Sequence, residues 1–481
     1  MRGAGSQSVR PARRVAGRSR RVGIGCRREL AVGRSSPRVA AVGETFGIPL
    51  HGRTIAIAGD RGIPLSPGRI ILLLGPSGSG KSSVLQRIDE QCIGACSVQR
   101  IGFPPSTAII DRVAPGAPLA DALALLTRCG LGDAHLWVRR FDTLSDGERF
   151  RARLARAIAI HQPTADAQPL LCDEFCSLLH RRAARAIAFS LRKLVTQRGM
   201  CMVLASVHDD IVADLQPDTI VRFDGAGGCA IETRAVRPNK PISLRRSLRI
   251  EPGVKRDYEA LAGMHYRATA ELGFVDKVFV LRDRGEPQPL GIVVYSHGPL
   301  ELALRNRATG GRFSRNPEKL NRSFRILRRL VIHPDLRGCG LGHYLVRKTL
   351  PLVGTLYVEC LAGMGEFNPV FEKAGMTRVG RYPPPPGPQR AVRALREMDV
   401  DPNGMDFPRL VCRRPRVRSV VAAAVKDWYA ATTAEGERRV ARQSPELLAQ
   451  LFRGVIGSRP VYYLWRRGRP AGRGRGVAGS P

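Results

Sequence analysis

A glycine-rich run directly follows a short and strongly apolar segment of the chain. Residues 70–74 (Ile-Ile-Leu-Leu-Leu) predict a buried strand, and a helical pattern begins at Val84. Between them, glycines let backbone N–H groups point inward at phosphate oxygens, and the helix N-terminus favours the same anion. The spacing G-x-x-x-x-G-K-S therefore predicts an ATP-phosphate loop, in which Lys81 reaches the β- and γ-phosphates and Ser82 ligates Mg²⁺. The expected binding residues are Gly75, Ser77, Gly78, Gly80, Lys81, Ser82 and Ser83.

Two adjacent acids end a second hydrophobic segment. Residues 169–172 (Pro-Leu-Leu-Cys) predict a strand, and Asp173 and Glu174 follow it. An aspartate in this position suits Mg²⁺ coordination through water, and the neighbouring glutamate suits polarisation of an attacking water molecule. We therefore expect Asp173 as a metal ligand and Glu174 as the catalytic base.

A third motif lies between these two. Residues 144–148 (Leu-Ser-Asp-Gly-Glu) precede a basic amphipathic helix, and Ser145 with Glu148 also fits a helix capping box. The position of this motif between the other two decides for function, and it resembles the signature of the ABC ATPases. The resemblance implies that Ser145 and Gly147 bind the γ-phosphate held by a second subunit, which predicts a head-to-tail homodimer. It also makes His208, at the end of a predicted strand, the catalytic histidine that contacts the γ-phosphate.

The chain departs from the ABC pattern at several points. His180 stands where the family has an aspartate, and Gln99 is the nearest candidate for the family's glutamine, although it comes early. The segment between Lys81 and Ser145 is short. In transporters this segment docks membrane partners, so its reduction argues against transport. Phe46 suits either stacking on adenine or packing in the core.

A second glycine loop lies in the middle of the chain. Residues 324–333 predict a strand, the sequence Arg-Gly-Cys-Gly-Leu-Gly spans residues 337–342, and a helix is expected over residues 343–349. Small residues at this junction again expose amides to a pyrophosphate. The pattern resembles the coenzyme A loop of the GNAT acetyltransferases, and residues 368–376 resemble that family's closing helix. The resemblance implies acetyl-CoA as cofactor, bound by Arg337, Gly338, Gly340 and Gly342.

The residues that would handle protons in this second block are less defined. The GNAT family often places a tyrosine acid on the closing helix, where this chain has Phe371, which has no proton to donate. Transfer can also proceed largely by positioning the amine against the thioester. The side chains that suit proton transfer, and equally suit structural roles, are Tyr357, Glu359, Glu366 and His333.

The predicted fold class is α/β, with a P-loop ABC ATPase domain, a GNAT-like α/β domain and a short, mostly helical C-terminal segment. The expected boundaries are a disordered basic tail (1–43), the ATPase domain (44–232), a linker (233–249), the GNAT-like domain (250–380), a proline-rich linker (381–390), the helical segment (391–465) and a basic tail (466–481). The first tail fits a disordered segment or an over-extended start better than a transit peptide.

Composition points to an anionic partner. The chain has 78 Lys and Arg against 41 Asp and Glu, a formal net charge of +37. This charge favours nucleic acid as a partner, and a general Arg bias of the genome explains it about equally well. Aromatics near the C-terminus either stack bases or form a small core: Trp428, Tyr429, Tyr462, Tyr463 and Trp465. The 11 scattered cysteines and the lack of a long apolar run predict a cytoplasmic protein without a membrane span.

The combined motifs predict an enzyme in which an ABC-type ATPase is coupled to acetyl transfer from acetyl-CoA to an amine, with nucleic acid as an acceptor class. The alternative is an ATP-driven switch or interaction protein whose GNAT domain is inactive or only senses acyl-CoA. An energising subunit of a transporter is the weakest of the three hypotheses.

Overall fold

The computed structural model describes residues 19–161, 168–237, 240–265, 272–382, 386–404, 406–430, 443–457 and 459–468. The chain forms two compact units, each assembled from separate stretches of sequence. The first unit contains residues 1–270 together with 279–292 and 330–345, and the second contains 271–278, 293–329 and 346–481. Part of the expected GNAT-like block thus belongs to the same compact unit as the ATPase block.

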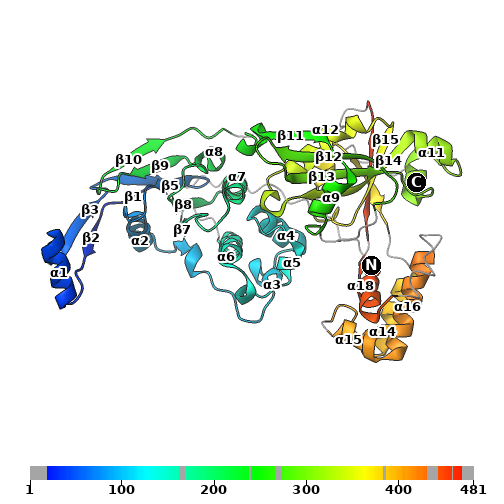
Figure 1. Ribbon diagram of the computed structural model, residues 1–481, viewed down its shortest axis with the longest axis horizontal. Coiled ribbons are helices and arrows are strands. Elements are labelled where there is room, and N and C mark those ends of the chain that lie inside the picture. Colours follow the sequence, from blue (N-terminus) through cyan, green and yellow to red (C-terminus); the bar gives the residue numbers. More distant parts are fainter. Residues whose placement is uncertain are drawn as a thin grey trace. The chain divides into compact units, whose positions relative to one another are not determined.

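A six-stranded sheet forms the centre of the first unit (Figure 1). Its order is β10 (Cys229–Thr233), β9 (Thr219–Phe223), β5 (Ile70–Leu74), β8 (Cys201–Ser206), β7 (Pro169–Cys172) and β6 (Cys96–Ser97). Neighbouring strands are parallel except at β10, which pairs antiparallel with β9 at the edge. The predicted strands at residues 70–74 and 169–172 are therefore confirmed.

Strand β5 is buried on both faces, which explains its unbroken apolar sequence. Ile70, Leu72 and Leu74 pack with helices α4 (Leu119–Arg128), α6 (Asp146–Ile160) and α7 (Arg181–Arg198). Ile71 and Leu73 face the other side, where they pack with helix α2 (Lys81–Gln91). The shorter helices of this unit are α3 (Ile109–Val113), α5 (Ala134–Trp137), α8 (Val212–Leu215) and α9 (Lys255–Ala262).

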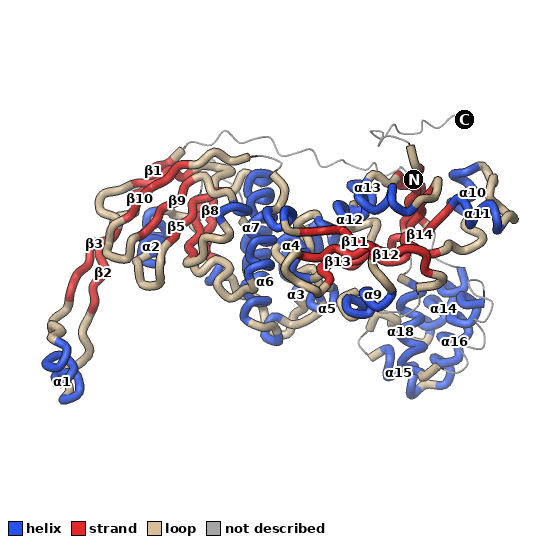
Figure 2. The backbone as a smooth tube through the Cα atoms, turned by 45° about the horizontal axis from the view of Figure 1, so that its top comes forward, coloured by secondary structure: helices blue, strands red, loops and turns tan. Residues whose placement is uncertain are grey.

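The prediction of a disordered tail through residue 43 is wrong for residues 20–43. Strand β1 (Arg20–Gly23) pairs with β4 (Gly62–Leu65), and β2 (Cys26–Leu30) pairs with β3 (Arg53–Ile57). Single apolar residues among the arginines supply the core contacts. Val22 and Ile24 are buried in the same apolar cluster as Ile71 and Leu73 of β5. Helix α1 (Pro37–Phe46) caps the far end of the β2–β3 ribbon (Figure 2). Residues 1–18 lie outside the described residues.

The expected linker over residues 233–249 is partly structured. The 3₁₀ helix at Ser243–Arg246 is held by Asp214, because the Ser243 amide donates to Asp214 Oδ1 at 2.6 Å. The Asp214 side chain is almost fully buried and also accepts from Arg185. Strand β11 (Leu248–Pro252) then begins before the end of the predicted linker. A buried carboxylate thus anchors the entry into the second α/β block.

A second sheet has the order β11, β12 (Val275–Asp283), β13 (Pro289–Ser296), β14 (Phe324–Ile332), β15 (Tyr357–Ala362), β17 (Val461–Arg466) and β16 (Thr377–Arg381). Strands β14 and β15 are parallel, and β17 is antiparallel to both of its neighbours. The helices that alternate with these strands are α10 (Ala303–Thr309), α11 (Pro317–Ser323), α12 (Leu341–Thr349) and α13 (Val370–Ala374).

The C-terminal segment is not helical throughout. Helices α14 (Pro386–Glu397), α15 (Phe407–Arg413), α16 (Pro415–Ala430) and α18 (Pro445–Ile456) share one apolar core (Figure 1). Residues 461–466 (Val-Tyr-Tyr-Leu-Trp-Arg) instead form β17, because valine and aromatic residues favour a strand. Helix α14 also starts inside the predicted proline-rich linker, of which 383–385 lie outside the described residues. None of the helices described has the length and apolar composition needed to cross a bilayer.

Candidate functional site

The parallel strands of the first sheet bring three predicted motifs to one edge. Leu74 pairs with Ser206, the last residue of β8, and Cys172 pairs with Leu204, so the three strands end within two residues of one another at the same edge. The phosphate loop follows β5, the acid pair follows β7 and His208 follows β8. Because carboxyl ends of parallel strands form ligand crevices, the strand order alone assembles these groups.

Steric contacts require glycine at two positions of the phosphate loop. A Cβ on Gly80 would lie 2.5 Å from Ile57 Cδ1, and a Cβ on Gly75 would lie 2.9 Å from the Phe223 carbonyl oxygen. Gly78 and Gly80 also have φ of 78° and 96°, which L side chains rarely adopt. The loop therefore keeps its backbone amides close to the space in which phosphates are expected.

Lys81 stands at the first position of α2 and is nearly buried. Its Nζ donates to the carbonyl oxygens of Gly75 at 2.9 Å and Pro76 at 2.6 Å. Burial lowers the pKa of Lys81, while the charges of Asp173 and Glu174 raise it. The two acids are thus close enough to act on the lysine electrostatically, as a shared nucleotide site requires.

Ser79 is a residue of the loop that the sequence did not single out. Its side chain is 5% exposed, and among the described residues its Oγ has no hydrogen-bond partner. A buried hydroxyl without a partner costs free energy unless a further group satisfies it. A phosphate oxygen fits this requirement. The loop thus suits an anion by its backbone and by this side chain.

The acid pair adopts an unusual backbone conformation. Glu174 has φ of 45°, and Asp173 Oδ1 accepts the Glu174 amide at 2.9 Å. A left-handed glutamate costs about 1 kcal/mol, and strain of this kind concentrates at functional sites. The neighbouring Phe175 amide fixes the turn by donating to Ala205 on β8 at 2.7 Å. The conformation leaves Glu174 exposed while Asp173 is partly buried.

Gln99, the nearest candidate for the family's glutamine although it comes early in the sequence, contacts the acid pair. It follows β6, the strand next to β7, and its Nε2 donates to the Asp173 carbonyl at 2.6 Å. The short strand at Cys96–Ser97 places Gln99 next to β7. Its two residues are too few to show an alternating pattern, so the sequence gives no clear signal for it. The contact therefore places Gln99 beside the acid pair.

His208 lies two residues beyond the end of β8. Its backbone amide donates to Ser206 Oγ at 3.1 Å, and that hydroxyl donates to the Phe175 carbonyl. One serine therefore ties the histidine segment to the segment after the acid pair. His180, in the place of the family's aspartate, is exposed, and its Nδ1 accepts the Arg182 amide as the N-cap of α7.

The signature residues form the capping box that the sequence also allowed. Ser145 Oγ accepts the Glu148 amide at 3.4 Å, and Glu148 Oε2 accepts the Ser145 amide at 2.9 Å. The box orders the N-terminus of α6, where exposed amides and the helix dipole favour an anion. A Cβ on Gly147 would lie 3.0 Å from Leu179 Cδ2, so this loop packs on the segment after the acid pair. Capping and phosphate binding are thus compatible roles.

The loop over residues 337–342 has the predicted strand-loop-helix setting between β14 and α12. Gly338 and Gly340 have φ of 84° and 93°, which explains the glycines. The Arg337 guanidinium, however, donates to three carbonyls: Ile332 at 2.9 Å, Gly132 at 2.7 Å and Met264. Burial lowers the pKa of Arg337. An anion in this loop would have to compete with these acceptors for the arginine.

The predicted proton-handling groups of the second block have structural partners. Glu359 and Arg305 form a fully buried ion pair, with Arg305 Nη2 2.9 Å from Glu359 Oε1, and Tyr462 donates to Glu359 Oε2 at 2.7 Å. Glu366 pairs with Arg381, and Tyr357 stacks on Phe324. Burial lowers the pKa of His333.

A tyrosine does approach the closing helix from another element. Phe371 on α13 is buried, and its ring lies 5.3 Å from that of Tyr463 on β17. The Tyr463 hydroxyl donates to Glu372 Oε1 at 2.8 Å. Tyr462 and Tyr463 are fully buried, so they belong to the core rather than to a surface that stacks bases. Phe46 is 72% exposed, which makes its core alternative wrong.

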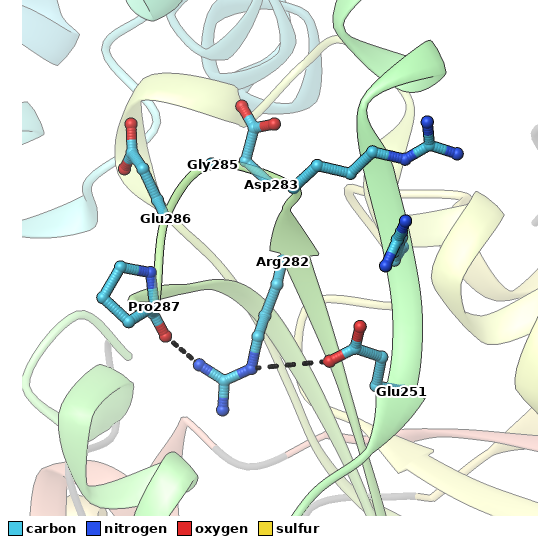
Figure 3. Close-up of a pocket in the computed structure, with 8 residues that line it drawn as sticks. Glu251, Arg282, Asp283, Gly285, Glu286 and Pro287 are labelled. Atoms are coloured by element: carbon cyan, nitrogen blue, oxygen red, sulfur yellow. Dashed lines mark hydrogen bonds and ion pairs between the residues drawn. The ribbon is translucent and has the colours of Figure 1, made fainter.

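A pocket of about 360 Å³ lies away from these motifs, beside β11 and the turn after β12 (Figure 3). Its lining alternates in charge, and Arg282 contacts Glu251 and the Pro287 carbonyl. Glu286 pairs with Arg182. No predicted site residue lines this pocket.

Comparisons with known proteins agree with the nucleotide site. The chain is 32% identical over 171 residues to the zinc import ATP-binding protein ZnuC of Yersinia pestis, and equally to that of Yersinia enterocolitica. Each match covers 32% of this chain and 64% of the relative. The chain thus spans somewhat less than two thirds of these relatives. No family model matches the chain.

Solved structures show the same class of similarity. The dimeric structure of MJ0796, a bacterial ABC transporter cassette, matches with a TM-score of 0.31 and 19% identity, covering 38% of this chain and 94% of that one. A bacterial Atm1-family ABC exporter with ATP bound matches with a TM-score of 0.29, covering 36% of this chain and 35% of that one. Part of this chain is thus similar to the ATP-binding protein ZnuC, and the order of the motifs at the sheet edge agrees with that similarity.

Proposed function

We propose that this chain binds ATP with Mg²⁺ and hydrolyses it between two copies of its cassette. The observation that carries the proposal is the convergence of Lys81, Asp173, Glu174 and Gln99 at the ends of parallel strands. Lys81 and the loop amides hold the β- and γ-phosphates, and His208 contacts the γ-phosphate. Ser145 and Gly147 of the second copy close the site.

The donor set fits Mg²⁺, which prefers carboxylate and hydroxyl oxygens and shares phosphate oxygens with the protein. Ser82 and Asp173 would hold the ion, and when bound it would neutralise charge on the phosphates. Glu174 accepts a hydrogen bond from the attacking water and takes its proton as the water oxygen bonds to the γ-phosphorus, while the bond between the γ-phosphorus and the bridging oxygen breaks and ADP leaves. The strained turn at Glu174 keeps this carboxylate exposed toward the edge of the sheet.

The test is ATP turnover by the full chain, measured as phosphate release with Mg²⁺ and with EDTA. Analytical ultracentrifugation of the Glu174→Gln protein with ATP then reports the association. Phosphate release that requires Mg²⁺, with dimers only in the presence of ATP, supports the proposal. A protein that binds no ATP, or binds it and stays monomeric, contradicts it.

For the second block we propose transfer of an acetyl group from acetyl-CoA to an amine, with nucleic acid as the acceptor class. Support comes from the strand-loop-helix setting of Gly338 and Gly340 and from their positive φ. The pairing between the parallel strands β14 and β15 also ends at Leu327 and Cys360. Strand β14 continues to Ile332, so the two strands are no longer paired with each other beside the glycine loop. The net charge of +37 favours a polyanionic acceptor. Transfer of label from radiolabelled acetyl-CoA to RNA, DNA or protein, with and without ATP, tests this half.

The second candidate is an ATP-driven switch whose GNAT-like block only senses acyl-CoA. Two observations favour it: Phe371 lacks a proton to donate, and Glu359 is neutralised by Arg305. Acetyl-CoA that binds without labelling any acceptor would favour the switch, whereas transfer to any acceptor would reject it.

A further inference from the structure

The signature helix and the loop at residue 337 are joined by a single turn of backbone. Residues 130–132 form this turn; they come shortly after helix α4 and belong to the same compact unit as residues 330–345. Three consecutive carbonyls of this turn accept hydrogen bonds from three different side chains. Arg151 Nη1 donates to Gly130 at 2.9 Å, Trp137 Nε1 to Leu131 at 2.7 Å and Arg337 Nη1 to Gly132 at 2.7 Å.

Arg151 also contacts the N-terminal turn of its own helix, which carries the signature residue Gly147. It lies on α6, and its Nε donates to the Gly147 carbonyl at 3.1 Å. One guanidinium therefore holds both the signature glycine and the first residue of the turn. A displacement of the signature loop changes the position of Arg151, and Arg151 can hold both carbonyls only if the turn moves with it.

The backbone of this region also packs closely against residues 337 and 338. A Cβ on Gly132 would lie 2.8 Å from Arg337 Cβ, and a Cβ on Gly338 would lie 2.6 Å from the Thr127 carbonyl oxygen. Two glycines, one on each side, thus allow the backbones to approach closely. Close packing converts a small shift of the turn into a shift of Arg337, because no empty space absorbs it.

We propose that Arg151 is a positioning residue that couples the nucleotide state of the signature loop to Arg337. Engagement of the signature loop by nucleotide moves the Gly130–Gly132 turn and releases Arg337 from the Gly132 carbonyl. The freed Nη1 group is then available to the phosphates of an acyl-CoA, while Nε and Nη2 keep their contacts with Ile332 and Met264. The ligand named here rests on the proposed function, whereas the mechanical link rests only on the contacts above. By thermodynamic linkage, acyl-CoA also tightens nucleotide binding by the same factor.

The experiment measures amide hydrogen exchange of residues 333–345 in the full chain, with and without a non-hydrolysable ATP analogue and Mg²⁺. Calorimetry on the same samples measures acetyl-CoA affinity. The wild type should exchange faster in this segment with the analogue and should bind acetyl-CoA at least about fivefold more tightly. Arg151→Met should lose both responses, and Arg151→Lys should restore them only in part, since one amine cannot reproduce the two-sided contact.

The matched control is Arg156→Met. Arg156 is on the same helix and also donates to a backbone carbonyl, that of Arg112 at 2.5 Å, but it does not touch the turn. This variant should respond like the wild type. Gly132→Ala provides a second test if Arg151→Met does not fold, because the added Cβ displaces Arg337 directly and should also abolish the response.

The outcomes separate the inference from the proposed function. Analogue binding without any change in exchange, or a full response in Arg151→Met, overturns the coupling. A normal exchange response without acetyl-CoA binding in any state supports the coupling and rejects acyl-CoA as the ligand. Failure of the wild type to bind the analogue rejects the cassette proposal and the inference together.

Discussion

The side-chain amide of Gln99 donates to the backbone carbonyl of Asp173 at 2.6 Å, across two neighbouring parallel strands. This contact fixes the residue that is proposed to hold Mg²⁺, from the 3₁₀ helix Val98–Arg100 that follows the two-residue strand β6. A hydrogen bond of this kind contributes about 1 kcal/mol, which corresponds to about fivefold in a rate constant.

Gln99→Ala should therefore lower the kcat of ATP hydrolysis by about fivefold, with a smaller change in nucleotide affinity. The control is Gln91→Ala, because Gln91 also bonds a backbone carbonyl, that of Gly23 at 2.9 Å, away from the site. Equal losses of kcat in the two variants would show that the Gln99 contact has no special role.

Glu174→Gln should reduce phosphate release by 10²-fold or more, since an amide cannot accept a proton from water. Binding of ATP should persist, because Lys81 and the glycine loop are unchanged. Fluorescent-nucleotide titration measures binding, and malachite green assays measure release. Glu90→Gln, an exposed change on α2, should match the wild type. Turnover that survives Glu174→Gln would assign the base elsewhere.

Gly80→Ala should abolish nucleotide binding. The new Cβ would lie 2.5 Å from Ile57 Cδ1, and the alanine would have to adopt a backbone φ of 96°. Gly68 also has positive φ, at 75°, but a Cβ there meets nothing within 4 Å. Gly68→Ala therefore carries the backbone strain alone, about 1 kcal/mol, and should bind nucleotide normally. Isothermal titration measures the nucleotide affinity of both variants and so distinguishes the effect of the steric clash from the effect of the backbone strain.

Arg305→Met should destabilise the second unit by about 3–5 kcal/mol, because it leaves Glu359 charged and buried. Adding Glu359→Gln should recover most of this loss, since the amide keeps an acceptor for Tyr462 and removes the charge. The comparison is Arg322→Met, which breaks an exposed pair with Glu318 and should cost about 0.5 kcal/mol or less. Chemical denaturation gives all three values. A stable Arg305→Met single variant would contradict the importance of the pair.

His333 should make the protein less stable in mild acid. Burial lowers its pKa; Asp335 opposes this, and Arg182, Arg337 and His180 add to the lowering. The unfolded chain, with a histidine pKa near about 6.5, takes up the proton first as the pH falls. Stability is therefore retained above about pH 6.5 and is lost as the pH falls below it. The Tm of His333→Gln should fall less steeply between pH 7 and 5 than that of the wild type.

The parts of the fold that depend on local pattern were predictable. The phosphate loop needs a strand, a glycine run and a helix, and all three are contiguous in sequence. The acid pair follows an apolar strand directly. Their meeting at one edge then follows from parallel pairing, which needs no further information than the strand order.

Other features depend on contacts that the sequence does not display. Val22 and Ile24 are single apolar residues among arginines, so composition predicted disorder where strands form. Among the described residues, helices α14, α15, α16 and α18 lie between β16 and β17 in the sequence, and no local pattern shows that β17 pairs between β15 and β16. Arg337 carries the expected motif, but its engagement by Gly132 is a long-range contact.

The discontinuity of the first compact unit has a consequence for synthesis. Residues 279–292 and 330–345 pack with the segment that ends at residue 270, so this unit remains incomplete until Leu345 has left the ribosome. At ordinary elongation rates the wait lasts on the order of seconds. During that time the Gly132 turn lacks Arg337 and its backbone is exposed. A truncation in the 233–249 segment would make this transient exposure permanent, and such a fragment should be more prone to aggregation than the full chain.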